Sequence, residues 1–136
     1  MTGVLVDTDV FSFMFKRDSR AGAYHRVIGA RTVGLSFMTV AELRAWAILR
    51  RWGSRRVREL EEAIRRCVTV LPDAPTVSAW ATITAQRTRA GTPIGCADCW
   101  TAACAVRHGL PLVTHNSGDY EGIAGLALLR TDGGAT

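Results

Sequence analysis

The sequence predicts an α/β fold: a three-layer α/β/α sandwich around a central, mainly parallel sheet of four or five strands. Two observations carry this prediction. Short apolar runs alternate along the chain with longer stretches of helical periodicity, which is the pattern of repeated βαβ units. The apolar runs are also continuous, as expected of strands that are buried on both faces.

The first strand and helix are predicted at the start of the chain. Residues 3–6 form an apolar run that ends abruptly at Asp7, and Asp9 is the expected N-cap of a helix that begins near Val10. A polar break follows, and a second helical piece is expected around residues 23–28.

A second strand over residues 32–37 passes directly into a long helix. Thr39 and Glu42 have the three-residue spacing of a capping box, so this helix is expected to begin at Val40. It ends at residues 52–53, where a glycine interrupts the helical pattern.

The remaining elements continue the alternation of helices and strands. Ser54 is the expected cap of a helix whose outer face is charged. The predicted elements are a helix over 55–66, a strand over 68–71, a helix over 76–90, a helix from 97–98 to 108–109, a strand over 112–114 and an edge strand over 126–129. The polar, glycine-rich residues 131–136 are expected to be loose.

The composition is that of an ordinary globular protein with an excess of arginine. The chain has 136 residues, of which 48% are hydrophobic and 21% charged, so one domain over residues 1–136 can bury a substantial core. The net charge of +5 favours a polyanionic partner, nucleic acid first. No apolar run approaches membrane-spanning length and no basic leader is visible, so we expect a cytoplasmic protein without a membrane partner.

The four cysteines invite three interpretations: a zinc site, a disulfide, or simple packing. Cys96 and Cys99 have the spacing of a zinc half-site, but no second pair or histidine set completes it. Cys104 lies in the same alanine-rich helical stretch, and Cys67 lies apart from it. We therefore expect reduced, buried thiols that pack as small hydrophobic side chains.

Four acidic residues lie where a predicted strand has just ended or a predicted helix begins: Asp7, Glu42, Asp98 and Asp119. Because the carboxyl ends of parallel strands lie on one side of a sheet, these side chains are expected to converge. Carboxylates that lie this close raise one another's pKa, and a divalent cation such as Mg²⁺ or Mn²⁺ removes the repulsion.

Each of these acids also has a purely structural explanation. Glu42 can be only the capping-box partner of Thr39, and Asp98 can be only an acid favoured by the helix dipole. Asp119 can be only a residue that shapes a turn. The presence of four such acids at one predicted sheet edge favours a functional site over these separate explanations.

Four sequence blocks that contain these acids resemble a known family. VLVDTDV, TVAEL, PIGCADCWTAACA and LVTHNSGDY resemble, in content and order, the pattern of PIN-domain ribonucleases, in particular the VapC toxins of bacterial toxin–antitoxin pairs. The blocks span nearly the whole chain. Two positions depart from the family pattern: Asp9 stands where Asn or Ser is common, and Tyr120 stands where Phe is common.

The resemblance implies a PIN-like fold and a divalent-metal-dependent endoribonuclease that uses Mg²⁺ or Mn²⁺. It implies Asp7 and Asp98 as the principal metal ligands, with Asp119 as a further ligand, directly or through water. Glu42 would orient or deprotonate the attacking water. The resemblance also implies transfer RNA or ribosomal RNA as substrate, a small VapB-like antitoxin as partner, and a homodimer.

Polar residues beside the four acids are expected to support them through hydrogen bonds. Thr8 and Asp9 follow the first acid, and Thr114 and Asn116 precede the last. Thr114 and Asn116 fit equally well as residues that only shape their loop. His115 lies in the same loop as a candidate general base, although a carboxylate–metal site does not require one.

The densest basic region lies in the predicted helical hairpin, and its candidates for contacts with RNA phosphates are Arg50, Arg51, Arg55 and Arg56. Because glutamates are interleaved with the arginines at helical spacing, a solvated helix face explains this region equally well. Among the tryptophans, Trp46 lies one helical turn beyond Glu42 and is the best candidate for lining the site.

Two other functions fit part of the pattern. A non-catalytic RNA-binding or scaffold protein could use the arginine-rich hairpin without the acids. A receiver-like signalling module also binds Mg²⁺ in an acidic pocket, but it needs a lysine close by, and the one lysine of this chain, Lys16, is badly placed for that role.

Overall fold

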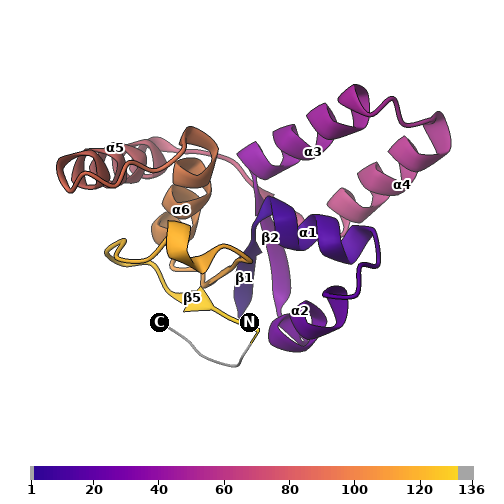
Figure 1. Ribbon diagram of the computed structural model, residues 1–136, viewed down its shortest axis with the longest axis horizontal. Coiled ribbons are helices and arrows are strands. Elements are labelled where there is room, and N and C mark those ends of the chain that lie inside the picture. The colour runs from indigo at the N-terminus through magenta and orange to yellow at the C-terminus, as the bar shows by residue number, and fades with distance from the viewer. Residues whose placement is uncertain (1, 132–136) are drawn as a thin grey trace.

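A computed structural model describes residues 2–131 and contains a five-stranded, all-parallel sheet between two layers of helices (Figure 1). The strands lie in the order β3-β2-β1-β4-β5. Their bounds are β1 Gly3–Val6, β2 Thr32–Ser36, β3 Val68–Val70, β4 Leu112–Val113 and β5 Leu128–Leu129. The predicted fold class and the five predicted strands are confirmed. The tail predicted over residues 131–136 lies outside the described residues except for Thr131.

The strand order reverses direction at β1, in the middle of the sheet. Successive strands step outward from β1 to β2 and β3 on one side, and from β4 to β5 on the other. Leu5 of β1 accordingly lies opposite Gly34 of β2 and opposite Leu112 of β4. In open α/β sheets, ligands bind in the crevice at the carboxyl ends of the strands beside such a reversal. Asp7 directly follows β1 and lies at this crevice.

Helices cover both faces of the sheet (Figure 1). One face carries α1 Thr8–Phe15, α2 Ala21–Ile28, α3 Phe37–Leu49 and α4 Ser54–Arg65. The other face carries α5 Ala74–Arg89 and α6 Cys96–His108. Helices α3 and α4 form a hairpin that projects away from the sheet, and Arg44 of α3 joins Glu61 of α4 in a two-bonded ion pair at 2.9 and 3.1 Å.

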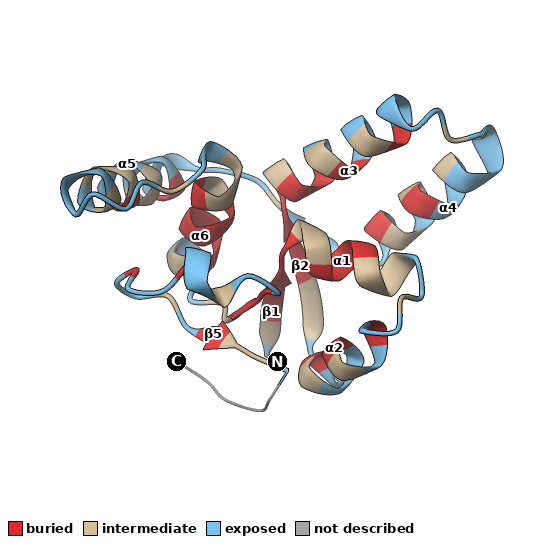
Figure 2. Ribbon diagram, viewed as in Figure 1, coloured by how far each residue is buried: buried red, intermediate tan, exposed pale blue. Residues whose placement is uncertain are grey.

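The side chains of β1 alternate between two hydrophobic cores. Val4 and Val6 pack into the core under α1 to α4, whereas Leu5 packs into the core under α6. All three are at most 1% exposed, and Figure 2 shows buried residues in the carboxyl-terminal parts of the central strands and along α6. Burial on both faces explains why the sequence of β1 is continuously apolar.

Helix α6 lies close to the sheet because the side chains that face it are small. Ala102, Ala103 and Ala105 are almost fully buried there. Gly109 ends the helix in the left-handed conformation, with φ of 63°, which a residue without a side chain adopts at little steric cost. The chain then turns directly into β4, so α6 and β4 deliver their functional residues to the same edge of the sheet.

The caps of two helices differ from the predicted ones. Asp7, rather than Asp9, is the N-cap of α1, and its Oδ1 accepts a 2.9 Å hydrogen bond from the backbone N–H of Val10. Ser36, rather than Thr39, is the N-cap of α3. Since α3 begins three residues earlier than predicted, Glu42 lies in its second turn and is not a capping-box partner.

Two further helix starts also differ from the prediction. Helix α4 begins at Ser54 itself, with Gly53 as its N-cap. Helix α5 begins at Ala74 and not at residue 76 as predicted, because Asp73 and Thr76 form a capping box. Within residues 2–131, no helix is both long and apolar enough to span a membrane.

Candidate metal and nucleic-acid site

A pocket of about 180 Å³ lies at the carboxyl edge of the sheet, beside the reversal of strand order. Four separate segments of the chain contribute to it. The residues that line it are Asp7, Thr8, Asp9, Glu42, Trp46, Asp98, Thr101, Asn116, Asp119 and Tyr120. The structure therefore brings all four predicted acids together, with three of the four predicted supporting residues. The fourth, Thr114, lies directly behind Asp7.

Asp7 is the most buried acid of the pocket, with 6% of its surface exposed. Burial removes its carboxylate from water and raises its pKa from 3.8 to about 6, although hydrogen bonds from the Thr114 hydroxyl and the Val10 N–H act in the opposite direction. The nearby charge of Asp9 raises the pKa further. Ionising Asp7 at this position therefore costs more free energy than ionising an aspartate in water.

Glu42 is held by a hydroxyl from another helix. Thr8, at the start of α1, donates a hydrogen bond to Oε1 of Glu42 at 2.8 Å, and its oxygen lies 3.0 Å from the Thr39 hydroxyl. This contact joins the first turn of α1 to the second turn of α3. It keeps the side chain of Glu42 directed into the pocket. A capping-box partner would instead have turned back to the N-terminus of its own helix.

Asp98 lies in the first turn of α6, where the helix dipole favours a negative charge. Burial nevertheless raises its pKa, the hydrogen bond from Tyr120 lowers it, and the charges of Asp119 and Asp9 raise it again. The Tyr120 hydroxyl donates to Asp98 Oδ1 at 3.1 Å. Asp98 is therefore oriented from outside its own helix.

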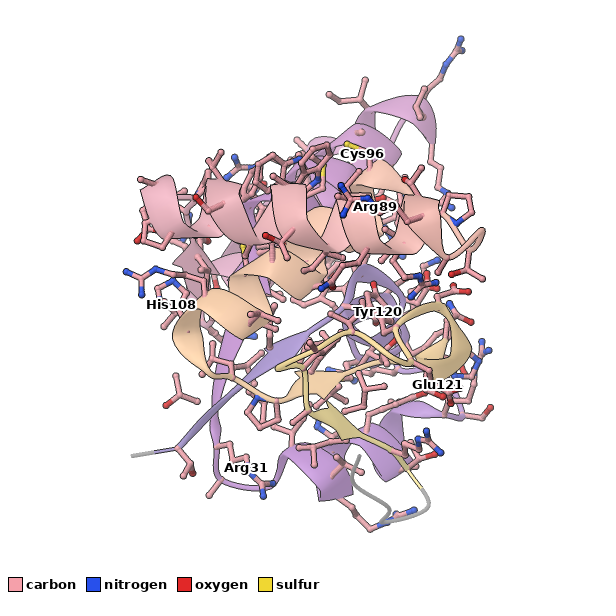
Figure 3. All side chains as sticks on the ribbon, turned by 90° about the vertical axis from the view of Figure 1, so that its left-hand side faces the viewer. Arg31, Arg89, Cys96, His108, Tyr120 and Glu121 are labelled. Atoms are coloured by element: carbon pink, nitrogen blue, oxygen red, sulfur yellow. The ribbon has the colours of Figure 1, made fainter. Side chains whose placement is uncertain are left out.

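Tyr120 and Thr101 line the pocket, although neither was predicted to be a site residue. Tyr120 is 2% exposed, and burial together with the charge of Asp98 raises the pKa of its phenol, which keeps the phenol protonated as a donor. In Figure 3 it points into the molecule beneath α5, while Glu121 lies on the outer loop. Its signal in the sequence was the departure from Phe at that position, which adds the hydroxyl that contacts Asp98.

Asp119 ends a short 3₁₀ turn, Ser117–Asp119, in the loop after β4. Arg87 of α5 holds this loop from behind, because its guanidinium donates to the backbone carbonyls of Asp119 at 3.2 Å and Glu121 at 3.3 Å. The same guanidinium also donates to the carbonyl of Thr92 at 2.7 Å. The first two bonds join the loop that carries Asp119 to the end of α5, and the third joins α5 to the segment that follows it.

Asn116 joins the loop after β4 to the segment after β1. Its amide donates to Asp9 Oδ2 at 3.0 Å, and its backbone N–H donates to the Thr114 hydroxyl at 3.0 Å. The Thr114 hydroxyl in turn donates to Asp7. Thr114 and Asn116 thus shape the loop through one hydrogen bond and hold Asp7 and Asp9 through two others. The two roles expected of these residues, shaping the loop and supporting the acids, are both present.

The donor set of the pocket fits a hard cation. Five carboxylates line it, and no basic side chain among the described residues does so. Across residues 2–131, no three Asp, Glu, His or Cys side chains stand close enough together to form a ready-made metal site. Mg²⁺ keeps several of its waters and needs only one or two direct carboxylate ligands, so the donor set fits a partly hydrated ion.

The predicted arginines do not line the acidic pocket. The Arg50 guanidinium lies over the ring of Trp46, which does line the pocket. Arg55 forms an ion pair with Glu59 at 3.3 Å, as expected of a solvated helix face. Arg51 is exposed at the end of the hairpin turn. Arg56 lies over the ring of Trp52, on the side of the hairpin that faces α1.

His115 does not line the pocket, although it lies in the loop that carries Asn116. Its Nδ1 lies 2.7 Å from the Tyr24 hydroxyl, and its ring contacts Phe13 edge to face. These contacts give His115 a packing role between the loop and helices α1 and α2.

All four cysteines are free thiols. Cys99 and Cys104 are buried as predicted, and burial raises the pKa of Cys104 to about 11, so this thiol stays protonated. The prediction that all four are buried was wrong, since Cys67 is half-buried and Cys96 is exposed at the start of α6 (Figure 3). Cys96 is the first residue of α6, and Pro93 and Gly95 before it are exposed as well.

Comparisons with known proteins identify similar sequences and structures. The PIN domain profile matches residues 4–125. The chain is 33% identical, over 135 aligned residues, to the VapC ribonuclease Y4jK of Sinorhizobium fredii (strain NBRC 101917 / NGR234), and the alignment covers 93% of this chain and 96% of that protein.

Solved structures give the same result for the fold. DNA-bound VapBC from Salmonella typhimurium is similar with a TM-score of 0.81 and 25% identity, covering 96% of this chain and 99% of that one. VapBC-1 from nontypeable Haemophilus influenzae is similar with a TM-score of 0.84 and 22% identity, covering 95% and 98%. These likenesses confirm the predicted PIN-like fold.

Proposed function

We propose that this chain, which belongs to the PIN-domain family and is a VapC homologue, is an endoribonuclease that hydrolyses RNA phosphodiester bonds with a divalent cation. The observation that carries the proposal is the pocket of five carboxylates, because four separate segments bring them together at the crevice of the sheet. Mg²⁺ or Mn²⁺ is the proposed cofactor, since both prefer oxygen ligands.

Asp7 and Asp98 are the proposed principal ligands of the cation, and Asp119 completes the set directly or through water. A cation bound there would polarise the scissile phosphate and lower the pKa of a bound water. Thr114 and Tyr120 keep the first two carboxylates in place through their hydroxyl hydrogen bonds.

Glu42 is the proposed residue that orients or deprotonates the attacking water. It stands on α3, opposite α6, and the 2.8 Å bond from Thr8 holds its carboxylate at the pocket. In-line attack by this water would leave a 3′-hydroxyl and a 5′-phosphate on the RNA.

A structured RNA, transfer RNA or ribosomal RNA, is the proposed substrate, and a small antitoxin of the VapB type is the proposed inhibitor. The net charge of +5 favours a polyanionic substrate. An antitoxin arginine placed among the carboxylates would neutralise the pocket and block it. We also propose that the chain forms a homodimer.

The direct test is cleavage of total and transfer RNA by the purified protein with Mg²⁺ or Mn²⁺. We expect chelator to abolish cleavage and Asp98→Asn to slow it by at least roughly a hundredfold, because several kcal/mol of transition-state stabilisation are lost. Asp18→Asn is the matched control, since this aspartate lies outside the pocket and pairs with Arg20. Cleavage that persists unchanged in Asp98→Asn and in chelator would rule out the proposal.

Arg87 provides a test of the loop that carries Asp119. We expect Arg87→Ala to lower the cleavage rate by roughly tenfold, because the loop that carries Asp119 loses two hydrogen bonds. A small displacement of a reacting group can slow a reaction by this much. The matched control is Arg89→Ala, an exposed arginine on the same helix (Figure 3). Steady-state kinetics and thermal melting of both variants separate the loop effect from loss of folding; equal rates in the two would contradict this role.

A further inference from the structure

We infer that Trp46 and Arg50 form a subsite that takes an unpaired nucleotide of the substrate RNA beside the acidic pocket. In this subsite the base stacks on the arginine–indole pair, and the adjoining phosphate meets the Arg50 guanidinium. The inference rests on the proposed function, because it assigns the position of the RNA whose cleavage is proposed above.

Trp46 is chemically unlike the rest of the pocket wall. The other nine lining residues are acids, threonines, an asparagine and a tyrosine whose hydroxyl is already engaged with Asp98. Trp46 is half-buried, so one part of the indole packs against the core under α3 and another part faces the pocket. It is thus an aromatic surface at the place where the RNA has to lie for its phosphate to reach the carboxylates.

Arg50 places a positive charge next to this aromatic surface. Its guanidinium carbon lies 4.9 Å from the centroid of the Trp46 ring. Among the described residues no carboxylate forms an ion pair with Arg50, and the residue is exposed. Its charge therefore remains available to a phosphate, and its planar group remains available for stacking.

The spacing along α3 orders these groups for a single strand. Glu42, Trp46 and Arg50 follow one another at intervals of four residues, so they lie on one side of the helix and extend roughly 12 Å from the pocket outward. The three side chains match three successive parts of an RNA strand. The glutamate lies where the scissile phosphate and its cation would bind, the indole matches the neighbouring nucleobase, and the guanidinium matches the next phosphate. Stacking of unpaired bases on aromatic rings and guanidinium planes is the usual way that proteins hold single-stranded RNA.

A second arginine–tryptophan pair in the same hairpin supplies the contrast. Arg56 lies 4.2 Å from the ring centroid of Trp52, again at a four-residue interval. Trp52, however, stacks on Phe15 of α1 at 5.9 Å and does not line the acidic pocket. The two pairs share chemistry and spacing, and they differ in whether they face the pocket.

The test compares the two pairs in an Asp98→Asn background, in which RNA cleavage is expected to be at least roughly a hundredfold slower than in the wild type. Binding of a short single-stranded RNA is measured in Mg²⁺ by fluorescence anisotropy for Trp46→Leu and Trp52→Leu, which retain apolar packing. We expect roughly tenfold weaker binding for Trp46→Leu and little change for Trp52→Leu, with Trp46→Phe recovering most of the loss. A 2-aminopurine in the RNA should be quenched by the parent and not by Trp46→Leu.

Arg50→Ala and Arg56→Ala test the phosphate contact. We expect Arg50→Ala to reduce the slope of log affinity against log salt by about 0.7, the value for one phosphate contact on a single strand, and Arg56→Ala to leave the slope unchanged. Thermal melting checks that each variant is folded.

The outcomes separate the subsite from the proposed function. If the wild-type protein cleaves RNA and Trp46→Leu binds RNA as tightly as Trp52→Leu does, the subsite is wrong and the ribonuclease stands. The same conclusion follows if Trp46→Leu weakens the binding of a VapB-type antitoxin and leaves the binding of RNA unchanged. If the wild-type protein neither binds nor cleaves RNA, both proposals fail. If it binds RNA through Trp46 and Arg50 without cleaving, the subsite stands and the ribonuclease fails.

Discussion

Replacing Asp7 with asparagine is expected to remove nearly all RNA cleavage and, at the same time, to make the metal-free protein more stable. The loss of cleavage follows from the proposed role of Asp7 as a principal cation ligand at the centre of the pocket. We expect a fall of roughly a thousandfold, which corresponds to about 4 kcal/mol of transition-state stabilisation.

The gain in stability follows from the raised pKa of Asp7. Its folded pKa is about 6, whereas its ordinary value is 3.8, so the folded protein holds a proton there more tightly than the unfolded chain does. Stability therefore falls as pH rises from about 4 to about 6 and stays lower above that, by up to about 3 kcal/mol. Asparagine carries no charge and caps α1 as well as aspartate does, so Asp7→Asn avoids this loss.

Thermal melting in chelator measures this effect. At pH 7.5, we expect Asp7→Asn to melt roughly 5–10 °C above the wild type, and at pH 4 the two should melt together. Asp73→Asn is a control of opposite sign, because Arg107 and Thr76 hold the pKa of Asp73 below its usual range and its charge favours folding. An Asp7→Asn protein that melts below the wild type in chelator at pH 7.5 would contradict the account of Asp7.

Replacing Leu5 with alanine is expected to be the most destabilising of the substitutions considered. Leu5 is fully buried in the core between β1 and α6, and its removal leaves a cavity between the central strand and the helix that carries Asp98. Comparable leucine truncations lower the free energy of unfolding by about 2–5 kcal/mol. A domain of this size has only about 5–15 kcal/mol in total, so a large part of the stability is lost.

Urea unfolding followed by circular dichroism measures this loss. The matched control is Leu71→Ala, since Leu71 is 68% exposed after β3 and its truncation should change the free energy by less than about 0.5 kcal/mol. Equal midpoints for the two leucine variants would mean that the core under α6 is not packed as described.

The strands and the acids could be predicted because both depend on local patterns. A continuous apolar run that ends at Asp7 is typical of a buried parallel strand, and the rule that such strands end at one edge places Asp98 and Asp119 near it. The helix caps were harder to predict, because each depends on a single hydrogen bond between one side-chain oxygen and one backbone N–H. Ser36, Thr39 and Glu42 all lie near the start of α3, and their sequence alone did not show which of them caps it.

The contacts that fix the pocket could not be predicted, because they join distant parts of the chain. Arg87 reaches the carbonyl of Asp119 from a helix 32 residues earlier, and Tyr120 reaches Asp98 across 22 residues. The sequence around Arg87 does not indicate such a bond, and the departure from Phe at Tyr120 indicates a hydroxyl without indicating its partner. The exposure of Cys96 was missed for a similar reason, since burial at the start of α6 depends on what packs over that turn.

The order of the pocket acids along the chain determines when the pocket can form during protein synthesis. Asp7 and Glu42 come from the helices over one face of the sheet, whereas Asp98 and Asp119 come from the last third of the sequence and depend on α6 and β4. A ribosome that has not yet reached residue 98 carries a chain with at most three of the five carboxylates, Asp7, Asp9 and Glu42. Since β4 also inserts beside β1, the sheet itself is incomplete at that point. On the proposed function, a nascent chain has no complete acidic pocket, and so no nuclease activity, until residue 119 has been synthesised.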